Sequence, residues 1–214
     1  MSSLSVITVA AVIALLLTAA WRLASRRHVL PCPVWLRWLV ELDNPFTKTN
    51  RAAFIVDRLG LEAGMTVLDA GCGPGRLTAP LAERVGSSGR VVAMDIQAGM
   101  LSRARERTES AGLNNVEFLQ AGLGEGTFAR HDAFDRAVLV TVLGEIPDRE
   151  AAFSELFRAL KPGGILSATE VIFDPHFQPR GTVTRLAVAA GFRERAFFGH
   201  RLAYVIHFEK PSRG

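Results

Sequence analysis

The chain has 214 residues, 49% of them apolar and 21% charged, and a formal net charge of +4 at pH 7. This composition excludes a disordered chain and allows one packed domain of about 150 residues with an appendage. Residues 1–60 hold seven Lys or Arg against three acids, whereas the rest of the chain is balanced. Because the positive excess is local, a basic nucleic-acid-binding domain is not expected.

The first predicted element is the apolar run Leu4–Trp21, LSVITVAAVIALLLTAAW, which has no charge and no helix breaker. As a helix rising about 1.5 Å per residue it would measure about 27 Å, close to the ~30 Å hydrocarbon core of a bilayer. Positive charge follows the run, in WRLASRR, instead of preceding it, which argues against a cleavable signal peptide. Residues 1–27 are therefore predicted to form one transmembrane anchor with a basic flank on the cytoplasmic side, with a buried core helix as the alternative.

Residues 28–46 are predicted to form a juxtamembrane connector. Val34–Leu42 has the spacing of a short amphipathic helix between proline-containing boundaries. All three tryptophans precede residue 39, and indole rings favour the membrane interface. The apolar side of this helix is expected either to lie on the membrane or to pack against the following domain.

From Thr47 onward, strand and helix patterns alternate. Strands are predicted at 66–70, 90–95, 116–120, 134–140, 164–171, 193–199 and 201–210, and helices at 51–61, 76–86, 97–111, 148–160 and 182–190. Repeated β-α-β order with continuous apolar strands predicts a doubly wound, Rossmann-like α/β domain with a mostly parallel sheet over residues 47–214.

The segment VLDAGCGPGRLT, Val67–Thr78, runs from the first predicted strand into a helix. Glycines allow the backbone to approach a ligand without Cβ atoms, and the following helix presents its N-terminus. Ligands of such sheets bind beyond the carboxyl ends of the strands, where this loop is expected. The spacing of Gly71, Gly73 and Gly75 is G-x-G-x-G, whereas the dinucleotide fingerprint places its third glycine one residue later.

Three segments resemble, in the same order, class I S-adenosylmethionine-dependent methyltransferases of the UbiE/Coq5-like group. They are the loop VLDAGCGPG, the acid that ends the second strand in VVAMDIQAGML, and LKPGGIL before the fifth strand. The resemblance covers about residues 47–210. It implies S-adenosylmethionine as cofactor and a seven-stranded sheet whose antiparallel last strand is inserted beside the sixth.

The resemblance also implies roles for single residues. Asp69 and the three glycines Gly71, Gly73 and Gly75 fall where the family holds the amino-acid part of the cofactor. Asp95 falls where an acid binds both ribose hydroxyls, which suits a carboxylate because it accepts two hydrogen bonds from a diol.

On the adenine side, Ile96 and Met100 are expected as apolar neighbours, although Met100 equally fits a core position. The family often places an acid where this chain has Gly122, so backbone groups at Gly122 and Leu123, or the side chain of Glu125, are expected to replace it. The remaining predicted cofactor-binding residues are Cys72, which also fits a small packing residue, and Val140.

Methyl transfer from a sulfonium is an in-line displacement, so alignment supplies much of the acceleration. The segment LVTVLGEIPDRE is expected to line the acceptor pocket, and it lacks the signature of enzymes that methylate amide or exocyclic nitrogens. Glu145 is predicted to contact the acceptor as a general base or as the partner of a cationic amine, with a solvated or capping acid as the alternative. His176 is predicted as a proton acceptor because its ordinary pKa is near neutral, with a surface histidine as the alternative.

Only about twenty residues separate the fifth and sixth predicted strands, which is too few for a substrate domain. The acceptor is therefore expected to be small, or the exposed head of a larger molecule, and to partition into the membrane. A quinol-type precursor is favoured, while phospholipid headgroup N-methylation and methylation of a small thiol or phenol stay open. A non-catalytic S-adenosylmethionine-binding regulatory protein is the alternative of another class. No metal and no nucleic acid are expected as partners.

Overall fold

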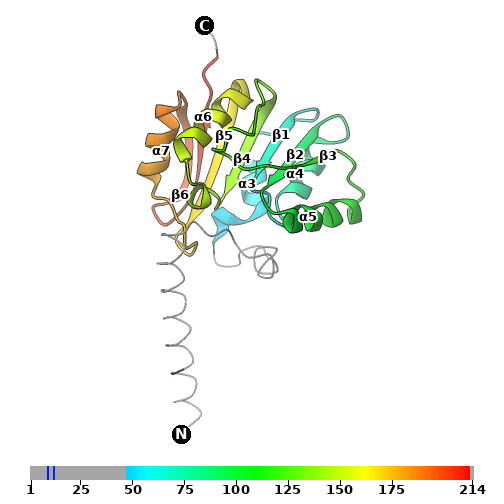
Figure 1. Ribbon diagram of the computed structural model, residues 1–214, viewed down its shortest axis with the longest axis horizontal. Helices are drawn as coiled ribbons and strands as arrows, with labels where there is room; N and C mark the ends of the chain where they lie inside the picture. The colour runs from blue at the N-terminus through cyan, green and yellow to red at the C-terminus, as the bar shows by residue number, and fades with distance from the viewer. Residues whose placement is uncertain (1–8, 10–11, 13–46, 213–214) are drawn as a thin grey trace.

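The computed structural model describes residues 9, 12 and 47–212 (Figure 1). The predicted anchor and connector lie outside these residues, apart from Val9 and Val12, which are both helical and 51% and 49% exposed. Within the described part of the chain, no helix has both the length and the apolar character that crossing a bilayer requires.

Seven strands of the described chain form one sheet in the order β3-β2-β1-β4-β5-β7-β6. Their bounds are β1 Thr66–Ala70, β2 Arg90–Asp95, β3 Val116–Gln120, β4 Phe134–Val140, β5 Leu160–Val171, β6 Arg193–His200 and β7 Ala203–Glu209. Strands β1 to β5 pair in parallel, and β7 is antiparallel to both of its neighbours. The predicted mostly parallel sheet with an antiparallel last strand is confirmed, and β1 to β4 have the predicted bounds.

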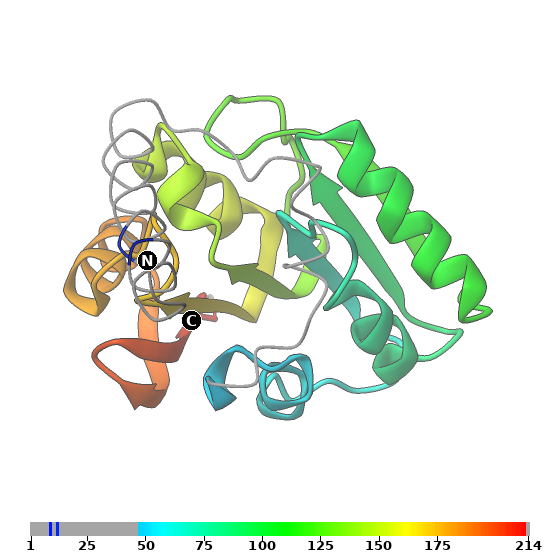
Figure 2. The same cartoon turned by 90° about the horizontal axis from the view of Figure 1, so that it is seen from below.

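Helices cover both faces of this sheet (Figure 2). One face carries α3 Ala52–Arg58, α4 Thr78–Val85 and α5 Ala98–Ser110, and the other carries α6 Arg149–Ala159 and α7 Arg180–Ala189. Two short 3-10 helices, η2 Lys48–Asn50 and η3 Leu143–Glu145, complete the described elements. Because side chains alternate along a strand, Val67 packs into the core under α3 and α4 while Leu68 packs into the core under α6 and α7.

The LKPGG segment does not form the expected turn ahead of the fifth strand. Strand β5 already begins at Leu160, which pairs with Phe134, and the register then shifts before Arg136. The Nζ atom of Lys161 donates to both carboxylate oxygens of Asp135, at 2.8 and 2.9 Å, so this irregular start is held in place.

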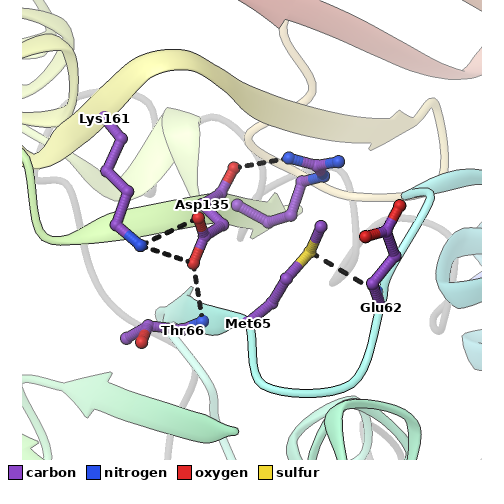
Figure 3. Close-up of polar contacts among 6 residues, drawn as sticks. Glu62, Met65, Thr66, Asp135 and Lys161 are labelled. Atoms are coloured by element: carbon purple, nitrogen blue, oxygen red, sulfur yellow. Dashed lines mark hydrogen bonds and ion pairs between the residues drawn. The ribbon is translucent and has the colours of Figure 1, made fainter.

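Asp135 joins a third strand to this arrangement, because the backbone N–H of Thr66 donates to its Oδ2 at 2.8 Å (Figure 3). Burial alone would raise the pKa of Asp135, but the hydrogen bonds from Lys161 and Thr66 outweigh it and hold this pKa below its ordinary value. The motif therefore ties together the amino ends of β1, β4 and β5. It lies at the edge of the sheet opposite the glycine loop.

Candidate active site

The glycine loop connects the carboxyl end of β1 to α4. The backbone N–H groups of Gly71 and Cys72 both donate to the carbonyl of Met94, at 2.7 and 2.9 Å, so the loop is fixed against the end of β2. Gly71, Gly73 and Gly75 have φ angles of 71°, 53° and 80°, in the left-handed region that disfavours other residues.

Side chains at two of these glycines would collide with their surroundings. A Cβ atom at Gly71 would lie 2.5 Å from Cγ2 of Val142, and one at Gly75 would lie 2.9 Å from Cα of Ala104. The loop is thus closely enclosed by the segment after β4 and by α5. Only glycine allows the chain to pass there, which explains the spacing seen in the sequence.

Asp69 lies beneath the loop. Its side chain is buried, and its Oδ2 accepts a hydrogen bond of 2.7 Å from the hydroxyl of Thr78, the first residue of α4. Burial raises the pKa of Asp69 to about 6. In this structure Asp69 joins the end of β1 to the start of α4 beneath the loop.

Asp95, the last residue of β2, lies directly beside the loop. Its Oδ2 accepts from the N–H of Gly73 at 3.0 Å and its Oδ1 accepts from the N–H of Gln97 at 2.8 Å. The residue is 8% exposed, and burial raises its pKa. Each carboxylate oxygen has two lone pairs, so both can also accept from a ligand. The structure therefore brings together the glycine loop and the acid that ends β2, which are 22 residues apart in the chain.

The remaining predicted cofactor residues differ in exposure. Ile96 is 48% exposed beside Asp95, whereas Met100 is 2% exposed, as expected for a core residue. Cys72 is buried among Ala93 and the α5 residues, so its side chain packs, and burial raises the pKa of its thiol. Val140 is half-buried at the end of β4.

The loop after β3 places the carboxyl group of Glu125 next to Gly122, the position where the family often has an acid. A Cβ atom at Gly122 would lie 2.7 Å from Oε1 of Glu125, so the Glu125 carboxyl occupies the space that a side chain at 122 would fill. The loop is held by buried Glu155 of α6, whose carboxylate accepts from the N–H groups of Gly124 and Gly126, both at 2.8 Å. The sequence gives no periodic signal for this clamp, because the partners are about thirty residues apart.

The segment after β4 forms the other side of the site. Thr141 has a φ of 54°, which is unusual for a β-branched residue and typical of strained functional segments. It leads into η3, which ends at half-buried Glu145. The guanidinium of Arg149 braces η3 by donating to the carbonyl of Leu143 at 2.8 Å.

The two predicted catalytic residues come from adjoining segments. A Cβ atom at Gly144 would overlap the backbone and Cβ of His176, so the loop after β5 packs directly on η3 next to Glu145. His176 is 6% exposed, which is at odds with a surface histidine, and its backbone N–H donates to Oδ1 of Asp174 at 2.7 Å. Both residues lie at the carboxyl ends of β4 and β5, as expected for the acceptor side.

Glu170, an acid of the segment that the sequence placed after the fifth strand, is buried and holds the following loop, which the sequence did not indicate. It is 1% exposed at the end of β5, and its Oε2 accepts from the N–H of Gln178 at 2.9 Å. Tyr204 of β7 holds the same loop by donating its hydroxyl to the carbonyl of Gln178 at 2.6 Å. Burial raises the pKa of Glu170 to about 8, so this carboxyl is mostly protonated at neutral pH.

A family model described as "Methyltransferase domain" matches residues 61–190, which include the glycine loop, Asp95, η3 and His176. The chain belongs to this methyltransferase domain family. S-adenosylmethionine is the cofactor of the domain, and the enclosed, Cβ-free cradle with the Asp95 carboxylate beside it fits that cofactor.

Curated relatives of this methyltransferase domain include proteins named ubiquinone/menaquinone biosynthesis C-methyltransferase UbiE. The chain is 37% identical to the one from Klebsiella pneumoniae over 126 residues, which are 57% of this chain and 50% of that protein. It is 36% identical to the one from Vibrio vulnificus, covering 57% of this chain and 48% of the relative. The chain thus spans about half the length of the curated relatives it matches.

Solved structures agree on the fold of the methyltransferase domain. A SAM-dependent methyltransferase from Aquifex aeolicus superposes with a TM-score of 0.73 at 22% identity, covering 84% of this chain and 99% of that one. The [4+2]-cyclase SpnF superposes with a TM-score of 0.67 at 19% identity, covering 76% and 81%. Since the fold also occurs in a protein named as a cyclase, the acceptor and reaction have to be argued from the site.

Proposed function

We propose that this protein transfers a methyl group from S-adenosylmethionine to a lipophilic, quinol-type precursor at a membrane. The observation that carries the proposal is the hydrogen bond from the backbone N–H of Gly73 to Asp95. It joins the glycine cradle to a buried carboxylate at the switch region of the sheet. The acceptor class is supported by the names of the UbiE relatives and by the short connection, residues 172–192, between β5 and β6 in the described chain.

Within this proposal, the cradle from Gly71 to Gly75 holds the amino-acid part of the cofactor, and Asp95 accepts from the ribose hydroxyls. The exposed side chain of Ile96 covers one face of the adenine. Glu125 takes the place of the acid missing at Gly122 and accepts from the adenine amino group. When bound, S-adenosylmethionine supplies a methyl group on a sulfonium, which is the electrophile of the reaction.

On the acceptor side, η3 and the loop after β5 present Glu145 and His176. Methylation of a quinol ring carbon releases one proton, which either group can accept if it lies within hydrogen-bond reach of the acceptor. We assign Glu170 a positioning role, since its carboxyl holds the Gln178 end of the loop that carries His176. The protonated state of Glu170 keeps this buried position neutral.

The membrane location rests on the sequence of residues 1–46. The uncharged run Leu4–Trp21 is long enough to span a bilayer, and the basic flank that follows favours a cytoplasmic domain. This arrangement brings the catalytic domain to an acceptor that partitions into the bilayer.

The test combines binding with product identification. Calorimetry of the full chain with S-adenosylmethionine is followed by transfer of a labelled methyl group to three acceptors in vesicles: a demethylated polyprenyl quinol, phosphatidylethanolamine, and a lipophilic thiol. We expect cofactor binding and a labelled quinol. A labelled methyl group on the phospholipid or on the thiol would show that the acceptor belongs to that class instead of the quinols. Binding without any labelled product, including from a membrane extract, would favour the non-catalytic regulatory protein.

A further inference from the structure

Two loops that each carry an exposed apolar side chain meet at the carboxyl end of β5. Phe173, in the loop after β5, is 73% exposed, and Leu202, in the turn between β6 and β7, is 41% exposed. The ladder between β5 and β7 continues beyond Val171 and Ala203, because the N–H of Ile172 donates to the carbonyl of Leu202 at 2.7 Å. The two loops therefore form one tip, which we define as residues 172–174 and 200–202.

The charge on and beside this tip is mainly positive. Arg201 is exposed next to Leu202, and exposed Lys48 lies in η2, which packs against β7 and β5. The one acid of the tip, Asp174, is half-buried and directs its Oδ1 to the N–H of His176. A surface of exposed large apolar groups with nearby cations matches the interface of an anionic bilayer.

The chain enters the domain beside the same tip. The methyl group of Thr49 would lie 2.9 Å from a Cβ atom at Gly199, so η2 contacts the end of the β6–β7 hairpin. Residues before Thr47 thus join the domain next to the tip, and these residues include the uncharged run Leu4–Trp21 and all three tryptophans. Figure 1 shows the β6–β7 turn and the cyan segment that begins at Thr47 at the same end of the domain.

We infer that the tip formed by residues 172–174 and 200–202 docks onto the surface of a bilayer that contains anionic lipids, with Phe173 and Leu202 inserted among the headgroups. This inference rests on the proposed membrane location and adds a second contact, made by the catalytic domain itself. A bilayer is favoured over a protein partner because the six residues of the tip are far fewer than the about 20 residues a side that a stable protein interface uses.

Docking would also orient the candidate active site. His176 follows Phe173 by three residues and is packed on η3, so the acceptor side of the site borders the tip. Insertion of the tip places this side at the membrane surface. A lipophilic acceptor then reaches Glu145 and His176 without crossing water.

The experiment places an environment-sensitive fluorophore on single cysteines in the full chain, reconstituted into vesicles. The positions are Phe173→Cys, Leu202→Cys and, as a matched control, Val188→Cys, which is 54% exposed on α7 away from the tip. The background carries Cys32→Ser, and Cys72 remains because it is buried. Quenching is measured with lipids that carry a nitroxide near the headgroup, with and without phosphatidylserine.

We expect quenching at positions 173 and 202 at least threefold stronger than at 188, and stronger still with phosphatidylserine. The double substitution Lys48→Glu and Arg201→Glu should remove the phosphatidylserine dependence at position 173. Equal quenching at 173 and 188 would overturn the inference. If the labelled protein with equal quenching still methylates the quinol and sediments with vesicles, the proposed function stands and only the docking fails. Strong quenching at 173 without any methylated product keeps the docking and rejects the proposed reaction.

Discussion

The backbone N–H of Gly73 donates a 3.0 Å hydrogen bond to Oδ2 of Asp95, so the glycine loop and the end of β2 form one unit. A change at either residue therefore affects both the shape of the cradle and its charge. Asp95 and Gly73 are 22 positions apart in the chain, and the parallel register of β1 and β2 brings them together.

Asp95→Ala should weaken S-adenosylmethionine binding by about 2–3 kcal/mol, because a buried acceptor of ligand and loop hydrogen bonds is lost. Calorimetry measures the affinity. The control is Asp57→Ala, whose carboxylate is 59% exposed and pairs with Arg84 on the surface, and which should leave affinity unchanged. Unchanged affinity in the Asp95 variant would mean that the ribose lies elsewhere.

Gly71→Ala should reduce both stability and cofactor affinity because its Cβ overlaps Val142. Gly112→Ala is the matched control, since Gly112 has nearly the same φ, 70°, but nothing within 4 Å of the added atom. We expect the Gly71 variant to lose about 1–3 kcal/mol more than the control in urea unfolding. Combining it with Val142→Ala should restore part of the loss, and the absence of any rescue would argue against the steric cause.

Glu155→Ala leaves the N–H groups of Gly124 and Gly126 without their carboxylate acceptor and should destabilise the domain by about 2–4 kcal/mol. Hydrogen exchange should accelerate over residues 122–128, which this carboxylate holds. Glu150→Ala, at an exposed position on the same helix, should change neither quantity. Equal exchange rates in both variants would show that the loop is fixed by other contacts.

Glu125→Gln tests the assignment of the adenine contact. If the Glu125 carboxylate accepts from the adenine amino group, wild type should prefer S-adenosylhomocysteine over S-inosylhomocysteine, which lacks that amino group. The preference should shrink roughly tenfold in the variant, consistent with about 1.4 kcal/mol for one charged hydrogen bond. If the preference is the same in both proteins, the adenine amino group is instead recognised by backbone groups at Gly122 and Leu123.

Glu170→Gln should change how stability depends on pH. The folded pKa of Glu170 is raised from 4.5 to about 8, so the folded protein keeps a proton that the unfolded chain loses. The contribution of the Glu170 proton to the free energy of unfolding is full below pH 4.5 and is lost as pH rises through 8. The variant should match wild type near pH 5 and be more stable by roughly 2–4 kcal/mol at pH 9. Urea unfolding across this range checks it, and parallel curves for the two proteins would contradict it.

Periodicity and glycine spacing were sufficient for the sheet because β1, β2 and the second half of β4 are buried apolar runs. The edge strand β3 is only half-buried, and it was recognised from its place in the β-α-β order. The segment around Lys161 was misjudged, since its glycines suggested a turn. The ion pair of Lys161 with Asp135 instead holds an irregular strand start, and a pair 26 positions apart leaves no periodic trace.

The candidate site divides in the same way. Gly71, Gly73, Gly75 and Asp95 follow strand ends, so their convergence could be anticipated from topology. The importance of Glu155 and Glu170 could not, because it comes from burial of a carboxyl group between elements that are distant in sequence. Burial of this kind is decided by tertiary packing, and a single carboxyl in a sequence carries no sign of it.

The position of β7 has a consequence for how the chain is made. The last strand of the described sheet, β7, lies between β5 and β6 and pairs with both. Until residues 203–209 have left the ribosome, β6 has no neighbour in the sheet and the edge of β5 is open. A nascent chain cut short before this strand would therefore leave β6 unpaired on both sides and one edge of β5 open. Unpaired strand edges are the usual starting points of aggregation. Completion of the sheet thus depends on the final residues of the domain, long after the cofactor cradle has been translated.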